Sequence, residues 1–187
     1  MPLDMEDARM KRPSIIVVLL TLLFAFTVAA RAQMQAPKPG PEHKKLDYFL
    51  GSWTTDGDMK PGPMGPGGKF TGTSHDEWMD GGFFIVIHSD MKMPMGTGTG
   101  LAVMGYNADQ KKYTYHEFNS MGEAEAATGT VDGDTWTWTD ENMMNGNLVH
   151  GRYTMKILSP TSYTFKYEVS QNGNWITVMD GKTTKTN

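Results

Sequence analysis

The segment YTYHEFNSM, residues 113–121, holds a dense row of groups capable of binding chemistry. Side chains alternate between the two faces of a strand, so Tyr115 and Glu117 share one face and His116 lies on the other. A phenol and a carboxylate side by side can hydrogen-bond a polar group held next to them. The sequence leaves two interpretations open. Tyr115 and Glu117 either line a cavity as ligand-binding residues or belong to a solvated outer surface.

Aromatic and imidazole side chains add three further candidates for ligand contacts. Trp53 follows a Gly-Ser step, Trp78 comes shortly before an Asp-Gly-Gly turn, and His88 lies in the apolar segment FFIVIHSDM. Indole rings either fill a protein core or form a binding wall for a flat or apolar ligand. A histidine in such a strand is either a hydrogen-bonded core residue or a ligand contact. The predicted ligand site therefore consists of Trp53, Trp78, His88, Tyr115 and Glu117.

Metal and cofactor binding have weak support in the sequence. The five histidines are scattered, with no pair at metal-ligand spacing on one element. Met91, Met93 and Met95 alternate along one segment, so their thioethers would share a side and suit copper(I). The alternative is that they are flexible apolar filling at the mouth of a barrel. Haem is not expected, because the last strand, WITVMDGKTTKT, offers no histidine. We therefore predict no metal and no cofactor.

Composition and motifs argue against two other classes of function. The chain has no cysteine and no Gly-x-Ser-x-Gly motif, so nucleophilic catalysis is not indicated. An acid–base enzyme would need Glu117 and a histidine within hydrogen-bond reach of each other in one pocket. A net charge of −4 without a clustered basic face does not fit a protein that binds nucleic acid.

The elements that must position these residues are strands. After Gly51 the apolar pattern alternates with period two to the end of the chain, and turn residues recur at regular spacing. Residues 60–68 are too rich in proline and glycine for a strand, and residues 94–100 are expected to be a flexible connection. The strands are predicted near residues 52–59, 69–79, 83–92, 99–106, 112–119, 122–131, 134–140, 148–158, 162–169 and 174–185.

Ten short strands joined by hairpins, with no long crossover, predict an all-β fold. An antiparallel up-and-down β-barrel is the expected form, because closing the sheet removes its edges. The segment PEHKKLDYFLG, residues 41–51, predicts one short helix with Pro41 in its first turn and Gly51 as its stop. We expect this helix to cover one end of the barrel and Trp53 to point inward beneath it.

Four segments carry a resemblance to a known family. They are PGPEHKKLDYFLGSW, GTSHDEWMDGGFF, LAVMGYNADQKKY and FNSMGE, beginning at residues 39, 72, 101 and 118. In this order they resemble the DUF1579 family of uncharacterised bacterial proteins over nearly the whole chain after its N-terminal segment. That family is similar to calycin-type barrels, which include lipocalins, fatty-acid-binding proteins and nitrobindins. The resemblance implies a fold and, by analogy of fold alone, a ligand carrier. It implies no catalytic residue.

The N-terminal segment has the pattern of a secretory signal peptide. Lys11 and Arg12 precede an uncharged apolar run, residues 14–30, which ends in an Ala-Arg-Ala cleavage pattern. A membrane anchor is the alternative, but the run is short of the roughly 20 residues that a span requires. We expect a signal peptide at residues 1–32, a Pro-rich tether at 33–40 and a single barrel domain at 41–187. The mature protein is expected to be periplasmic or secreted, with no remaining membrane span.

The sequence therefore predicts an exported barrel that binds a small apolar or amphipathic ligand in its lumen. Apolar burial would hold such a ligand, and a few polar groups would orient it. The alternative is a non-enzymatic structural or interaction module whose barrel is filled by side chains. The identity of a ligand and the oligomeric state are not encoded in any pattern that we recognise.

Overall fold

The computed structural model describes residues 36–62, 65–144, 146–171 and 173–186. The predicted signal peptide lies outside these residues. The secondary structure belongs to one compact unit, Lys38–Asn187. Within the described part of the chain, no helix is long and apolar enough to cross a membrane.

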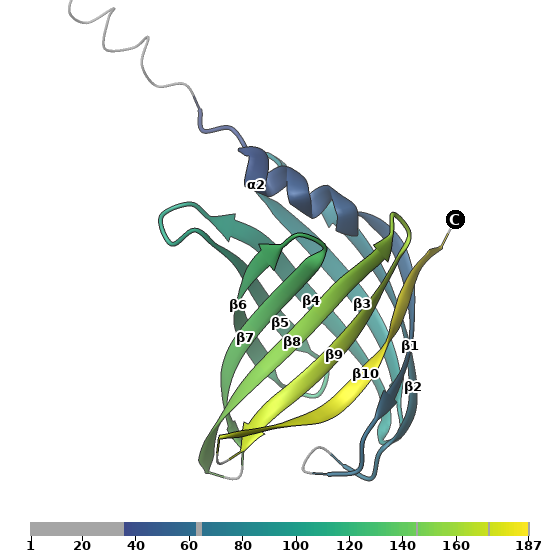
Figure 1. Cartoon of the computed structure of the whole chain (residues 1–187). Helices are drawn as coiled ribbons and strands as arrows, with labels where there is room; N and C mark the ends of the chain where they lie inside the picture. The colour runs from purple at the N-terminus through teal and green to yellow at the C-terminus, as the bar shows by residue number, and fades with distance from the viewer. Residues whose placement is uncertain (1–35, 63–64, 145, 172, 187) are drawn as a thin grey trace, which may run out of the picture. The chain divides into compact units, whose positions relative to one another are not determined.

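Ten antiparallel strands form a closed barrel in which each strand pairs with its neighbours in sequence and β1 pairs with β10 (Figure 1). This arrangement confirms the predicted all-β up-and-down barrel. The closing pair is in register from Ser52 opposite Thr186 to Met59 opposite Met179. The strands are β1 (Gly51–Met59), β2 (Gly68–Trp78), β3 (Phe84–Met93), β4 (Gly96–Asn107), β5 (Lys112–Asn119), β6 (Ala124–Asp132), β7 (Thr135–Met144), β8 (Asn147–Ser159), β9 (Ser162–Gln171) and β10 (Asn174–Thr186).

The structure corrects two sequence predictions around the hairpin between β3 and β4. Residues 94–100 were expected to be flexible, but β4 begins at Gly96 and its first residues pair with β3 as far as Met93. The prediction that Met91, Met93 and Met95 share one side of a strand is also wrong. Met91 and Met93 lie on β3, whereas Met95 lies in the turn after Pro94 with 59% of its surface exposed. The three sulfurs therefore do not share one face, because the strand ends before the third.

A short helical segment plugs one end of the barrel, as Figure 1 shows. It consists of the α-helix α2 (Pro41–Lys44) followed by the 3₁₀-helix η1 (Lys45–Phe49). Leu46 and Phe49 are buried in the barrel core, and the Phe49 ring meets Trp136 edge-on at 5.1 Å. Gly51 then turns the chain into β1 with φ of 103°, a conformation that glycine adopts without strain.

Glycines on the inner face let aromatic rings lie flat against neighbouring strands. A Cβ added at Gly129 would lie 2.6 Å from the Trp138 ring, and one added at Gly57 would lie 2.5 Å from the Phe70 ring. Trp138 in turn stacks on Trp136, and both indoles are buried. Such glycine–aromatic pairs allow large rings to pack inside the barrel.

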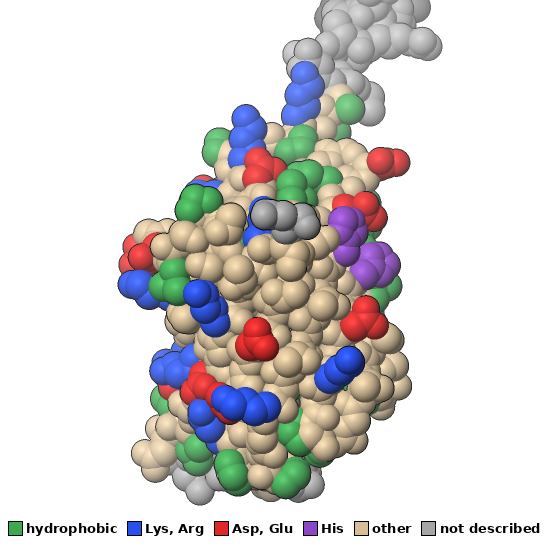
Figure 2. Space-filling model, turned by 90° about the vertical axis from the view of Figure 1, so that its right-hand side faces the viewer, with side chains coloured by type: hydrophobic (Ala, Val, Ile, Leu, Met, Phe, Trp, Pro, Cys, Tyr) green, Lys and Arg blue, Asp and Glu red, His purple; other side chains and the backbone are tan. Residues whose placement is uncertain are grey.

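The outer wall is mixed in character, with charged side chains scattered over it and apolar side chains such as Leu101 and Phe118 exposed on it. Figure 2 shows one side of the molecule, where acidic and basic side chains are scattered over a surface of mostly uncharged polar groups. Several of these charges pair across strands, including Lys69 with Asp58 at 2.8 Å and Arg152 with Glu168 at 2.8 Å. The wall thus presents no clustered basic face among the described residues.

The Gly129→Ala substitution tests this packing. Its methyl group would overlap the Trp138 ring, so we expect the free energy of unfolding to fall by ~1–3 kcal/mol, the usual cost of overpacking a core. Chemical denaturation followed by tryptophan fluorescence measures the change. Gly98→Ala is the matched control, because a Cβ there meets nothing closer than the Ser120 hydroxyl at 3.5 Å. Equal losses in the two variants would contradict the packing argument.

Candidate functional site

The inside of the barrel holds four of the five residues in the predicted ligand site. Tyr115 and Glu117 follow the same alternation as the buried Tyr113, so they face inward rather than toward solvent. This resolves the ambiguity of that strand. Trp53 and Trp78 also pack with the core side chains. Whether these four residues contact a ligand stays a prediction.

The two tryptophans of this set fasten the helical plug to the strands. The Trp53 indole donates a hydrogen bond to the carbonyl of Phe49. The Trp78 indole donates to the Asp47 carboxylate at 3.0 Å. The indole N–H groups of Trp53 and Trp78 therefore both donate to the helical plug, and the two rings close the lumen at that end.

His88 is the exception, because it lies on the outer wall. It is exposed and stands directly opposite His75 across β2 and β3. With Leu101 and Phe118 it lines a shallow hollow of about 460 Å³ on the outside of the barrel. The prediction of His88 as a lumenal ligand contact is therefore wrong. Both faces of this strand are apolar in sequence, so the alternation alone did not reveal which one faces inward.

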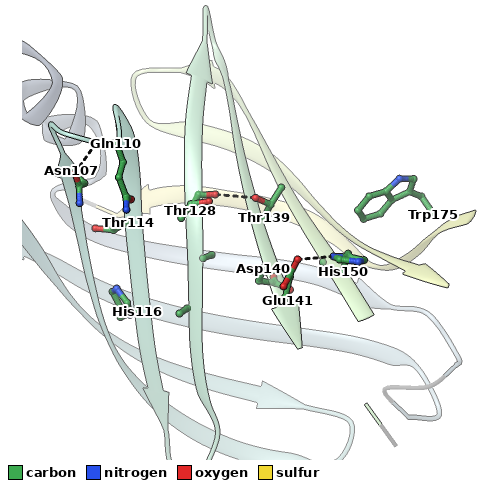
Figure 3. Close-up of a pocket in the computed structure, with 13 residues that line it drawn as sticks. Asn107, Gln110, Thr114, His116, Thr128, Thr139, Asp140, Glu141, His150 and Trp175 are labelled. Atoms are coloured by element: carbon green, nitrogen blue, oxygen red, sulfur yellow. Dashed lines mark hydrogen bonds and ion pairs between the residues drawn. The ribbon is translucent and has the colours of Figure 1, made fainter. Parts of the chain in front are cut away.

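A second and larger hollow, of about 780 Å³, also lies on the outer wall, over β5 to β8 (Figure 3). His150 pairs there with Glu141 at 3.3 Å, and the Thr139 hydroxyl donates to the Thr128 carbonyl at 3.5 Å. Trp175 borders this groove and carries the Arg152 guanidinium 4.2 Å from its ring centre. The groove is open to solvent, and most of the described residues that line it are exposed, so we treat it as part of the outer surface.

Three tyrosines that project into the lumen keep some accessible surface. Tyr115, Tyr153 and Tyr163 project inward, yet each retains surface accessible to a water-sized molecule. Burial nevertheless raises the pKa of Tyr115 and Tyr153 well above 10, and that of Tyr163 to about 12. Side chains that are shielded from bulk water but still accessible border an internal space.

A set of carboxyl groups lines the half of the lumen away from the plug. Glu117 accepts a hydrogen bond from the Tyr115 hydroxyl and lies directly opposite Glu125 across β5 and β6. Burial, with the nearby charges of Glu117 and Asp140, raises the pKa of Glu125 to about 7. Glu125 is also exposed, and it is the second residue of β6, beside the hairpin that joins β5 to β6. Asp140 accepts from the Asn142 amide at 3.0 Å.

Asp76 is a further inward carboxyl, close to the plug. Only 7% of its surface is exposed, and its Oδ1 atom has no hydrogen-bond partner. Burial raises its pKa to about 6, against the opposing effects of a hydrogen bond with Ser74 and the charges of His75 and Lys185. A buried acceptor without a donor is unusual in a folded protein and favours the neutral, protonated carboxyl.

The arrangement fits neither a metal centre nor the acid–base pair considered from the sequence. Among the described residues, no three His, Asp or Glu side chains converge on a metal-sized point. Glu117 is hydrogen-bonded to a tyrosine, while His75, His88, His116 and His150 are exposed. His43, the remaining histidine, is buried in the plug, where its Nδ1 atom accepts from the Gly40 amide.

Sequence reasoning missed several lumenal groups, although the period of two contains them. Asp76 lies two residues before Trp78, and Asp140 lies two residues after Trp138. Each aspartate therefore lies on the same face of its strand as an inward tryptophan. Glu125 shares a face with Ala127, which packs against the core. Every second residue along a strand from an inward tryptophan also faces inward, and applying this rule to Trp78 and Trp138 would have identified both aspartates.

The fold and the lumen define a small closed β-barrel with a plugged end and a mostly apolar interior that holds a few polar groups. The family model described as "Protein of unknown function (DUF1579)" matches residues 38–185. The chain therefore belongs to the DUF1579 family, as its sequence motifs predicted.

Two solved structures are similar to this chain, and the one with a TM-score above 0.5 supports the fold alone. The crystal structure of Rv2717c from M. tuberculosis superposes with a TM-score of 0.57 at 13% identity, covering 79% of this chain and 99% of that one. EF1p2_mFAP2b bound to DFHBI has a TM-score of 0.42 at 13% identity, covering 77% and 98%. No sequence match is found among curated proteins.

Asp76→Asn provides a test of the buried carboxyl. Folding raises the pKa of the Asp76 carboxyl from 3.8 to about 6. The contribution of Asp76 to the free energy of unfolding is therefore most favourable below pH 3.8, and it becomes less favourable as the pH rises from 3.8 to about 6. The neutral amide escapes this cost, so we expect the variant to be more stable than wild type above about pH 7, by at most ~3 kcal/mol. Near pH 3.5 the advantage should vanish.

Urea denaturation at the two pH values measures this difference. Asp56→Asn, at an exposed position of β1, is the control and should change stability equally little at both. If Asp76→Asn changes stability by the same amount at acidic and neutral pH, Asp76 is not a strained carboxyl.

Proposed function

We propose that this protein is an exported carrier that binds a small amphipathic molecule inside its barrel. The observation that carries the proposal is the set of inward tyrosines, Tyr115, Tyr153 and Tyr163, which border accessible space within the closed sheet. A side-chain-filled barrel would leave these rings no accessible surface.

The lining suits an amphipathic ligand. Apolar side chains such as Met91, Met179 and Phe165 supply surface for burial of a hydrocarbon or aromatic body. Tyr115 and Glu117 supply polar groups that orient one end of the ligand. Binding pockets commonly combine a mostly apolar wall with a few polar groups in this way.

Entry from the end opposite the plug is the natural route. The helix seals the other end, with Leu46 and Phe49 buried. Exposed apolar side chains occur at the hairpins of the open end, including Met121, Met143 and Leu148. A ligand with an apolar body would meet these side chains before it reached Glu125.

A matched pair of substitutions distinguishes the lumen from the outer groove. Ala127 packs its side chain inward beside Tyr115, whereas Ala126 is exposed and turns its side chain toward the groove that both residues border. Phenylalanine at residue 127 would fill the lumen, and at residue 126 it would fill the groove. We expect Ala127→Phe to abolish ligand binding and Ala126→Phe to leave it intact.

Native mass spectrometry of the protein, expressed with its full leader and purified without denaturant, detects a retained ligand. The fluorescent apolar probe N-phenyl-1-naphthylamine measures uptake into an emptied barrel. Thermal melts show whether each variant folds. If wild type carries no added mass and takes up no probe, the carrier proposal fails and a filled barrel that serves as an interaction module replaces it. Loss of binding in Ala126→Phe alone would move the site to the groove.

Export is supported by the N-terminal pattern of two basic residues, an apolar run and an Ala-Arg-Ala step. We expect cleavage after Ala32 and a mature N-terminus at Gln33. Intact mass of the protein recovered from a periplasmic or extracellular fraction measures this directly. Ala30→Arg, which replaces a small residue at the cleavage pattern, should leave the leader attached. A full-length chain in the cytosolic fraction would contradict export.

A further inference from the structure

The charges that face the lumen are strongly unbalanced. Asp76, Glu117, Glu125 and Asp140 all face inward by their register on β2, β5, β6 and β7. Among the described residues, Lys185 is the one Lys or Arg side chain that faces inward. Its ammonium group lies at the plugged end, 4.9 Å from the centre of the Trp53 ring.

Among the described residues, no Lys, Arg or His side chain forms an ion pair with Glu117 or Glu125. Glu117 and Glu125 stand directly opposite each other, a cross-strand arrangement that is destabilising for like charges. Their hydrogen-bond donor in the structure is the neutral Tyr115 hydroxyl, which serves Glu117. A positively charged group placed between the two carboxylates would remove the repulsion.

Asp76 is an independent indication that the lumen can bind a ligand that carries a hydrogen-bond donor. It is more than nine-tenths buried, and its Oδ1 atom has no partner. The Asp76 charge acts on Tyr163, and the charges of Tyr163 and Glu117 both act on Tyr153. Asp76 and Tyr163 therefore lie in the same electrostatic environment, as do Tyr153 and Glu117.

The required cation is organic rather than metallic. No three His, Asp or Glu side chains of the described chain converge as metal ligands. The walls around the carboxyl pair are aromatic, and Tyr115 lies 6.0 Å from Trp138 between ring centres. Aromatic faces beside carboxylates suit an ammonium group that is attached to an apolar body.

We propose that the lumen selects amphipathic amines, with Glu117 and Glu125 as the anionic partners of the ammonium group. This inference rests on the proposed carrier function and specifies the chemical class of its ligand. Asp76 adds an unpartnered acceptor at the plugged end of the lumen. Carboxylates and alcohols of equal chain length are disfavoured, because the former meet like charge and the latter leave the carboxyl pair uncompensated.

Three probes of one chain length test the selection: octylammonium, octanol and octanoate. We expect calorimetry with the wild-type protein at about pH 8, where an alkylammonium resembles lysine in remaining charged, to rank them in that order. Octylammonium should bind about tenfold more tightly than octanol, the gain from one charge-assisted hydrogen bond. Octanoate should bind most weakly.

The double variant Glu117→Gln with Glu125→Gln should remove the preference for octylammonium while octanol binding stays unchanged. Glu77→Gln, at an exposed position on β2, is the matched control and should bind all three probes as wild type does. If octanol or octanoate binds wild type as tightly as octylammonium does, the proposal that the lumen selects amines is wrong. The proposal that the lumen binds a ligand would still hold. If wild type binds none of the three and no N-phenyl-1-naphthylamine, the carrier function itself fails. The wild-type ranking decides the question even if the double variant does not fold.

Discussion

The pairing of β1 with β10 is the constraint on which the rest of this structure depends. It gives every strand two neighbours, so no strand edge is left to pair with another chain. It also separates an inside from an outside, and alternation along each strand then assigns every side chain to one or the other. Without this closure Glu117 and Glu125 would lie on an open sheet in full contact with water.

The helical plug makes the two ends of the barrel different. Tyr113 donates to Glu42 at 2.7 Å, and Tyr48 donates to the carbonyls of Ser159 and Ser162, so the plug is tied to strands around the rim. Its apolar side chains seal that end. Polar groups are therefore confined to a space that water enters from the other end, and burial raises the pKa values of the carboxyl groups there.

Inside and outside carry different chemistry as a result. The wall pairs its charges across strands or leaves them in solvent, where each pair contributes little. The lumen instead combines carboxyl groups with tyrosine and tryptophan rings and holds its one inward lysine at the plugged end. The proposed binding function in the lumen would account for the polar groups that remain in a region that apolar side chains could have filled.

Much of this architecture could be predicted from the sequence. Alternation of period two, turn residues between the strands and the Pro41-to-Gly51 helix pattern specified ten strands and one helix, because these signals depend on local geometry. The GTGTG segment was misjudged as flexible, because glycine weakens the strand signal although its alternating threonines pair with β3.

The sequence by itself determined which residues share a face, and it placed the strands and the plug. The tertiary structure decided which face is the inside. Tyr115 and Glu117 turn inward and His88 turns outward, yet all three lie in strands whose two faces are both plausible interiors. The choice depends on register with strands distant in sequence, since a shift of one residue exchanges the two faces. The opposition of Glu117 and Glu125 and the unpartnered oxygen of Asp76 arise from that same long-range register.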